Sequence, residues 1–169
     1  MKKIFYFSLF LSITISAFGQ EIIEDYWVTW DANYREVDVI SLFEFEKLYA
    51  DSIRRNPDIP QYYVRIDKYR FQAEYLGEVR VIDEEVKYSM KRVLKFFIPN
   101  SEQYHGLMGK ELLFRVGQEY VWMPIQSQLL EYFKKEIEKG ATVMLYCLFL
   151  GEHLWENVLY KTLFISEFY

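Results

Sequence analysis

Residues 119–150 carry the clearest pattern of hydrophobic and polar positions in the chain, EYVWMPIQSQLLEYFKKEIEKGATVMLYCLFL. Apolar and polar positions alternate first, apolar residues then recur at helical spacing over 127–139, and an apolar run closes the segment over 142–150. A period of two indicates a strand, a period near 3.6 indicates a helix, and a run that is apolar on both faces indicates a buried strand. The pattern predicts a strand, a helix capped by Ser127 and a central strand in one unit.

The segments on either side of this unit are also predicted to be strands and loops. Residues 100–109 are polar and predict a loop, and residues 111–125 predict a hairpin with Gly117 in its two-residue connection. Residues 151–157, GEHLWEN, predict a second polar loop, and residues 159–168 predict the final strand.

The middle of the chain holds one long strand pattern and one ambiguous segment. Residues 62–82 are β-branched and aromatic, and Gly77 inside them predicts a bend that lets one strand serve two sheets of a barrel. Residues 84–98 fit a helix capped by Asp83, or a strand that would point Arg92 inward. Capping and length favour the helix.

The N-terminal part predicts one further helix. Ser41 and Glu44 form a capping box, and Pro57 stops the pattern. Residues 26–30 alternate as on a short edge strand or an ordered arm. The apolar positions expected to face the core along the helix are Leu42, Phe45, Leu48, Tyr49 and Ile53.

Residues 1–19 have the pattern of a cleaved secretory signal. Lys2 and Lys3 precede an apolar run, and small residues stand before an expected cut ahead of Gln20. An uncleaved membrane anchor is the alternative, but the apolar run is shorter than the roughly 20 residues that span a bilayer. We therefore expect a periplasmic or secreted protein.

The composition fits one exported domain that is held together by packing. The chain is 51% hydrophobic and 20% aromatic, which supplies ample apolar area for a core. Removal of residues 1–19, with two lysines and no acid, takes the net charge from −5 to −7 and argues against nucleic acid as a partner. Cys147, the only cysteine, excludes an internal disulfide and is expected to be buried.

The order of bent strand, hairpin, helix and two further strands resembles the OB-fold, a five-stranded Greek-key barrel. Residues 121–140, 142–150 and 161–168 carry this resemblance. The chain also resembles small exported bacterial proteins of uncharacterised function. We expect an α+β fold in which an arm and an amphipathic helix at 20–60 pack on an OB-like barrel at 61–169. The helix at 84–98 is an insertion relative to that fold.

The resemblance implies where a ligand would bind, because OB-folds bind through the face of strands two and three and through two loops. The residues that match that face and the last loop are Phe114, Tyr120, Trp122, Glu152, His153, Trp155 and Glu156. The four residues of the loop could bind a sugar ring or perform acid–base chemistry. A solvated loop with its tryptophan tucked onto the barrel is the alternative.

No motif for a metal, a cofactor or a catalytic nucleophile is present, and His105 and His153 lack partners at ligand spacing. We therefore expect neither a cofactor nor a metal. A stripe of Lys87, Lys91, Arg92 and Lys95 could meet an anionic lipid or glycan, although a solvated helix face is the simpler interpretation.

These observations favour an exported, non-enzymatic binding module for an envelope protein, a glycan or a small ligand. The alternative is a carboxylate-dependent hydrolase of an envelope polymer, which needs two acids about 5 to 9.5 Å apart across a groove. The oligomeric state has no signal in the sequence.

Overall fold

The computed structural model describes residues 26–56, 58, 62–63, 66–155 and 158–169. The predicted signal at 1–19 lies outside them. The chain divides into two compact units, residues 1–33 and residues 34–169, and the second holds the whole sheet.

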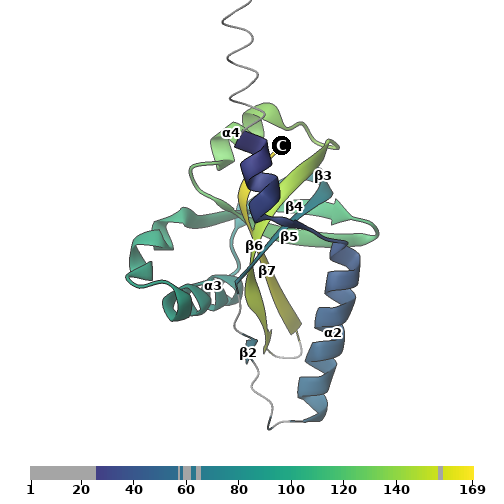
Figure 1. Cartoon of the computed structure of the whole chain (residues 1–169), viewed down its shortest axis with the longest axis vertical. Helices are drawn as coiled ribbons and strands as arrows, with labels where there is room; N and C mark the ends of the chain where they lie inside the picture. The colour runs from purple at the N-terminus through teal and green to yellow at the C-terminus, as the bar shows by residue number, and fades with distance from the viewer. Residues whose placement is uncertain (1–25, 57, 59–61, 64–65, 156–157) are drawn as a thin grey trace, which may run out of the picture. The chain divides into compact units, whose positions relative to one another are not determined.

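Five strands of the second unit close into a mixed β-barrel (Figure 1): β3 (Asp67–Val81), β4 (Met108–Val116), β5 (Glu119–Gln126), β6 (Thr142–Trp155) and β7 (Val158–Phe168). Their order is β3-β4-β5-β7-β6, and pairing of β3 with β6 closes the barrel. Neighbouring strands are antiparallel except β5 and β7, which run parallel and pair at Ile125 and Ile165. Two short strands, β1 (Arg35–Glu36) and β2 (Tyr62–Tyr63), extend the sheet along β3 and β6. The predicted α+β, OB-like barrel is confirmed.

The bend in β3 closes the barrel as predicted. The first part of β3 pairs with β6 and the second part pairs with β4, and the register shifts between Tyr75 and Val79. Gly77 lies in this gap with a φ of +80°, a conformation that costs glycine little. Gly117 likewise has a φ of +59° in the β4–β5 hairpin, as the two-residue connection requires.

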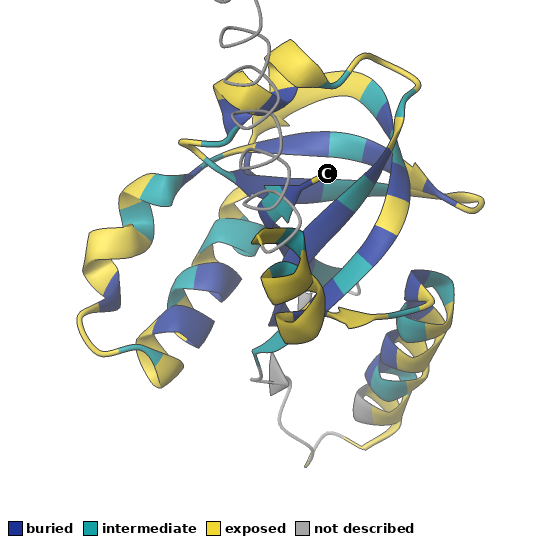
Figure 2. Ribbon diagram, turned by 45° about the horizontal axis from the view of Figure 1, so that its top comes forward, coloured by how far each residue is buried: buried dark blue, intermediate teal, exposed yellow. Residues whose placement is uncertain are grey.

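The barrel interior is a continuous apolar core, seen as the dark blue stretches along the strands in Figure 2. The short helix α4 (Leu130–Glu136) contributes Phe133, which has no exposed surface. Its ring centroid lies 5.1 Å from that of Tyr75, 5.9 Å from that of Phe114 and 4.9 Å from that of Phe168. These edge-on aromatic contacts fix α4 against the barrel.

Cys147 lies in the same core, as predicted, and burial raises the pKa of its thiol well above the ordinary value. A thiol without solvent access in an apolar environment is structural rather than reactive.

Helix α3 (Glu84–Phe97) confirms the helical alternative for residues 84–98. The Asp83 side chain caps it by accepting a hydrogen bond from the Glu85 N–H at 2.9 Å. Its buried residues belong to a second, smaller core, in which Met90 and Leu94 join Phe164 of β7. Phe97, the last residue of α3, is 44% exposed.

The loop predicted at 100–109 is wrong in detail, because residues Ser101–Leu107 form a 3-10 helix, η1, and β4 begins at Met108. Asn100 precedes η1 with a left-handed φ of 57°, which asparagine tolerates better than most residues.

Helix α2 (Val39–Arg55) begins earlier than predicted, and its cap is Asp38 rather than Ser41. The Ile40 N–H donates to Asp38 Oδ1 at 3.0 Å, and the Ser41 hydroxyl donates to Asp38 Oδ2 at 2.7 Å. The hydrogen bond from the Ser41 hydroxyl, together with backbone N–H groups, holds the pKa of Asp38 below its ordinary value. Serine thus supports the cap without being the cap.

The buried face of α2 is also rotated from the predicted one. Val39, Phe43 and Ala50 are buried, whereas Phe45 and Leu48 are 56% and 69% exposed. The prediction failed because a buried acid, Glu46, shares the core-facing side and interrupts its apolar pattern.

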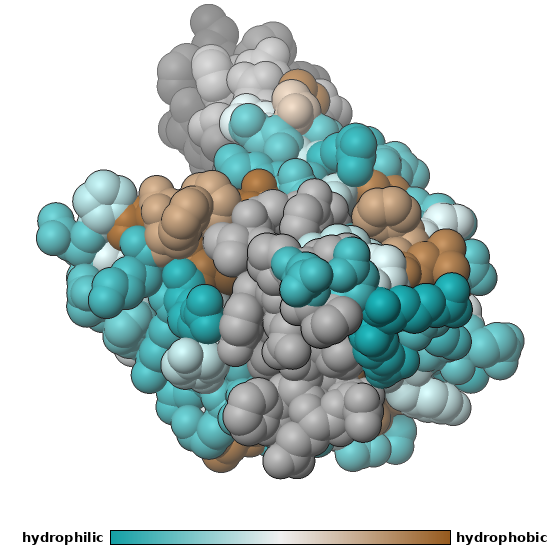
Figure 3. All heavy atoms as spheres, turned by 90° about the horizontal axis from the view of Figure 1, so that it is seen from below, coloured by the Kyte–Doolittle hydropathy of each residue, from teal (hydrophilic) through white to brown (hydrophobic). Residues whose placement is uncertain are grey.

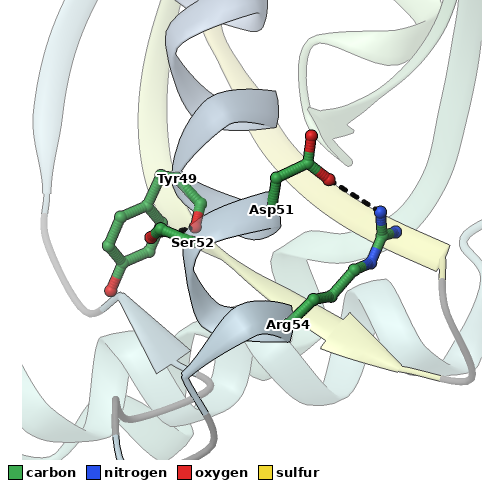
Figure 4. A network of polar contacts seen from close by, with 4 residues as sticks. All are labelled: Tyr49, Asp51, Ser52 and Arg54. Atoms are coloured by element: carbon green, nitrogen blue, oxygen red, sulfur yellow. Dashed lines mark hydrogen bonds and ion pairs between the residues drawn. The ribbon is translucent and has the colours of Figure 1, made fainter.

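Local contacts hold the last turns of α2 (Figure 4). The Ser52 hydroxyl donates to the Tyr49 carbonyl at 2.6 Å, and Arg54 pairs with Asp51 at 2.9 Å. Contacts three residues apart are the normal neighbours on a helix surface. Arg54 is therefore part of the helix end, as a cation in a last turn is expected to be.

Residues 26–33 of the first unit are helical, so the edge strand, one of the two alternatives for 26–30, is wrong. Tyr26 and Trp30 stand one helical turn apart, and their ring centroids are separated by 6.1 Å. The Asn33 side-chain amide donates to the Thr29 carbonyl at 2.7 Å. A pattern of five residues is too short to distinguish a period of two from a period of 3.6.

Two further boundaries differ from the prediction. Strand β6 continues to Trp155, so most of the predicted loop at 151–157 is paired strand, with Glu152 opposite Lys161. Helix α4 lacks a side-chain cap, and the Ser127 hydroxyl instead donates to the Gly106 carbonyl at 3.2 Å. Both differences arise from partners distant in the sequence.

Candidate functional site

The β4–β5 hairpin decides which of the predicted face residues can meet a ligand. Phe114 stands opposite Val121 and points into the barrel, where it has no exposed surface. Tyr120 and Trp122 occupy the alternate positions of β5 and point outward, and Tyr120 is 66% exposed. Since side chains of a strand alternate between faces, Phe114 cannot share a surface site with Trp122.

A cleft of about 360 Å³ lies on the outside of the barrel at Tyr120 and Trp122. Strands β3, β4, β5 and β7 and helix α2 all contribute to it. The side chains that line it include Phe43, Arg80, Asp83, Glu111, Glu119, Tyr120, Trp122 and Lys161.

The centre of the cleft is an ion pair stacked on an indole. Arg80, near the end of β3, stands opposite Glu111 of β4 in the strand register. Its Nε donates to Glu111 Oε1 at 2.6 Å, and its guanidinium carbon lies 4.0 Å from the centroid of the Trp122 ring. The three side chains therefore hold one another in place.

Glu111 is a buried acid at the centre of the cleft. Its side chain is 1% exposed, while that of Arg80 is 48% exposed. Burial raises the pKa of the Glu111 carboxyl above its ordinary value, although the hydrogen bond and the charge of Arg80 oppose that rise. Glu111 Oε2 accepts no hydrogen bond from the described residues. Because this oxygen has almost no contact with solvent, it adds to the cost of keeping Glu111 ionised.

Helix α2 and strand β7 form the other wall of the cleft. Lys161 Nζ lies 4.0 Å from the ring centroid of Phe43, which is buried against the barrel. Val39 and Phe43 belong to the barrel core, and the Ile40 side chain comes within 3.3 Å of where a Cβ on Gly117 would stand. Packing of α2 on the barrel thus positions Lys161 at the cleft.

The structure describes the backbone of three of the four residues that were predicted to bind in the last loop. Glu152, His153 and Trp155 lie in β6, where Glu152 and His153 also pair with β2, but their side chains lie outside the described parts. Glu156 lies outside the described residues altogether. The binding role predicted for these four residues stays a prediction.

The sequence missed Arg80, Glu111 and Lys161. Each lies in an alternating strand pattern and carries no motif, so only the pairing of β3 with β4 and the packing of α2 bring them to Trp122. The sequence could have indicated Arg80 and Glu111, because both fall on outward-facing positions of neighbouring strands.

Two features are absent from the described part of the chain. No group of three or more histidine, cysteine, aspartate or glutamate side chains there could hold a metal ion. Among the same residues, no helix has the length and apolar character needed to cross a membrane.

The fold and the cleft define a small α+β protein built on an OB-like, closed five-stranded barrel, with a polar and aromatic cleft on its outer face. Comparison with known protein families, with curated proteins and with solved structures finds no match to this chain. The function is therefore argued from the side chains alone.

Proposed function

We propose that this chain is an exported, non-enzymatic binding module that holds a glycan residue in the cleft at Trp122. The observation that carries the proposal is the exposed Tyr120 ring beside the Arg80–Glu111 pair, which is itself stacked on Trp122. A sugar ring offers an apolar face to an aromatic side chain and hydroxyl groups to charged side chains. OB-like barrels use the corresponding outer strands for oligosaccharides.

The cleft is preorganised for such a ligand. Arg80 is held by Glu111 on one side and by the Trp122 ring on another. Immobilising a free arginine on binding costs about 0.5–1.5 kcal/mol, and a side chain that is already fixed avoids most of that cost. The donors of Arg80 that Glu111 does not occupy suit hydroxyl groups, and the Arg80 side chain is 48% exposed.

The charges of the cleft favour a neutral ligand over an anion. Arg80 is neutralised by Glu111, and Lys161 stands with the acids Asp83 and Glu119 in the same lining. A phosphate or carboxylate would meet three acids and only two bases here, whereas a hydroxyl can pair with either.

Binding is also favoured over the hydrolase alternative. A glycosidase needs one acid free to donate a proton and a second carboxylate across the groove. Glu111 is engaged by Arg80, and Asp83 is engaged as the cap of α3. Two of the three acids in the lining therefore have structural partners.

The test is a titration of the isotope-labelled protein with a panel of neutral mono- and disaccharides that includes N-acetylated sugars, followed by nuclear magnetic resonance. We expect shifts of the Trp122 indole N–H and of backbone amides in β5 and β7. Tyr120→Ala should weaken binding at least about tenfold, because a stacked aromatic anchor contributes on the order of 1–2 kcal/mol.

Tyr132 supplies the matched control, since it is 63% exposed on α4 and does not line the cleft. Tyr132→Ala should bind as the wild type does. Shifts that gather away from β5 and β7, or equal affinities of the two alanine variants, would overturn the assignment of the cleft.

A further inference from the structure

A second recess lies away from the glycan cleft, between α3 and η1. It has a volume of about 750 Å³, and its lining includes Tyr88, Lys91, Arg92, Lys95, Phe96 and His105. None of these residues lines the cleft at Trp122.

Five of them form one stripe along α3. Tyr88, Lys91, Arg92, Lys95 and Phe96 follow one another at steps of three, one, three and one residues, which places them on one face of a helix. The opposite face is the buried one and supplies the apolar residues of the second core. The stripe therefore lies on the side of α3 that faces away from the second core.

The stripe combines cations with exposed aromatic rings. Tyr88 is 51% exposed and Phe96 is 75% exposed. The Phe96 ring packs edge-on against Phe97 with centroids 5.1 Å apart, and Phe97 is itself 44% exposed. Figure 3 shows hydrophobic residues exposed among hydrophilic ones on the left, the side on which α3 lies in Figure 1. Two adjacent exposed phenylalanines are costly in water unless another surface covers them.

The charge of the recess is opposite to that of the chain. The chain has a net charge of −5, yet Lys91, Arg92 and Lys95 face only one acid of the lining, Glu102. Neither Lys91 nor Lys95 forms an ion pair with a described residue, whereas Lys87 pairs with Glu84 at 3.6 Å on the same helix. A local excess of positive charge on an acidic protein indicates an anionic partner.

We propose that the stripe and the recess dock the protein on an anionic membrane surface, with a phospholipid phosphate held at Lys91, Arg92 and Lys95. Cations near a membrane attract anionic headgroups, and aromatic rings are favoured at the level of the headgroups. Phe96 and Phe97 make a lipid the better partner than a soluble phosphate, because a soluble phosphate leaves both rings in water. The protein would lie on the membrane as a peripheral protein rather than cross it.

The experiment is co-sedimentation of the chain from Gln20 onward, the expected mature protein, with vesicles. Vesicles of phosphatidylglycerol mixed with phosphatidylcholine should bind it, and vesicles of phosphatidylcholine alone should not. Each lysine at an anionic surface contributes roughly fivefold in affinity, so Lys91→Glu with Lys95→Glu should weaken binding by at least roughly 25-fold. Higher salt should weaken the wild-type binding because it screens exposed charges.

The matched control changes the same charge elsewhere. Lys134→Glu with Lys135→Glu alters two exposed lysines of α4 and should leave vesicle binding within about twofold of the wild type, since headgroup contact is local. Circular dichroism of both variants checks that the fold is retained.

Three outcomes would overturn the proposal. Equal loss in the α3 and α4 variants would indicate a non-specific charge effect, and indifference to phosphatidylglycerol would leave the stripe a solvated helix face. Competition by soluble glycerophosphate at the concentration of vesicle lipid would indicate a free phosphate site. Phe96→Ser distinguishes a membrane site from a free phosphate site. It should weaken vesicle binding several-fold and leave any glycerophosphate binding unchanged.

Discussion

Removal of the arginine from the Arg80–Glu111 pair tests the centre of the cleft most directly. Exposed ion pairs contribute about 0.2–1 kcal/mol to stability, and breaking a buried pair costs about 3–5 kcal/mol. This pair lies between the two cases, because the Glu111 side chain is 1% exposed and the Arg80 side chain is 48% exposed. We expect Arg80→Met to cost about 2 kcal/mol in the free energy of unfolding. Methionine keeps an unbranched apolar stem near Trp122, so the measured loss of stability reflects mainly the removal of the charge.

The pH dependence of that loss provides the sharper test. Burial already raises the pKa of Glu111 in the folded protein, so the native state binds the proton more tightly than the unfolded chain does. The carboxyl's contribution to stability therefore falls as the pH rises above its ordinary pKa of 4.5. Without Arg80 the pKa of Glu111 rises further, so the stability continues to fall up to a higher pH. The cost of Arg80→Met should thus be larger near neutral pH than at acidic pH, where Glu111 becomes protonated.

Urea denaturation followed by fluorescence and circular dichroism measures both quantities. The control is Arg115→Met, because Arg115 pairs with Glu74 across the same two strands while its side chain is 47% exposed and that of Glu74 is 27% exposed. It should cost less than about 1 kcal/mol at either pH. Equal costs for the two variants, or a cost of Arg80→Met that does not change with pH, would refute the account of Glu111 as a buried, partly compensated charge.

Two further predictions concern the barrel. Phe133→Ala should lower the free energy of unfolding by about 3–5 kcal/mol, since it leaves a cavity among three aromatic rings, whereas the neighbouring Tyr132→Ala should change it by less than about 0.5 kcal/mol. Similar midpoints of thermal unfolding for these variants would contradict the role of Phe133. Gly77→Ala should cost about 1–2 kcal/mol because Gly77 has a φ of +80° and a Cβ there would stand 2.9 Å from the Lys139 side chain. Gly106→Ala, where a Cβ meets nothing within 4 Å, serves as its control in the same assay.

The elements that the sequence predicted well are those whose signals lie within a few residues. Asp83 caps α3, Gly117 turns the β4–β5 hairpin and Gly77 bends β3, as their local patterns predicted. Capping needs a side chain two or three residues from an amide, and a positive φ needs only the absence of a Cβ. Neither depends on the rest of the fold.

The predictions that failed depended on contacts between distant segments. The cap and the buried face of α2 follow from how the helix lies on the barrel, and a buried acid on that face, Glu46, hid it in the sequence. Strand β6 continues through residues 151–155 because β7 and β2 pair with it there. A strand end is set by its partners as much as by its own residues.

In the candidate site too, local patterns could be predicted from the sequence and contacts between distant segments could not. Tyr120 and Trp122 point outward because side chains alternate along β5, and this could be predicted from the sequence. The sequence also placed Phe114 beside them, but the register of the hairpin turns Phe114 into the barrel. Arg80 and Glu111 meet only through the pairing of β3 with β4.

The sequence by itself determined the kinds of elements, their order and the apolar character of the core, because periodicity, capping and turn chemistry are local properties. The tertiary structure alone decided which charged side chains meet at the aromatic cleft and which face of α3 remains uncovered. Strand register and helix packing are set by burial summed over the whole barrel, and no short stretch of sequence contains that sum.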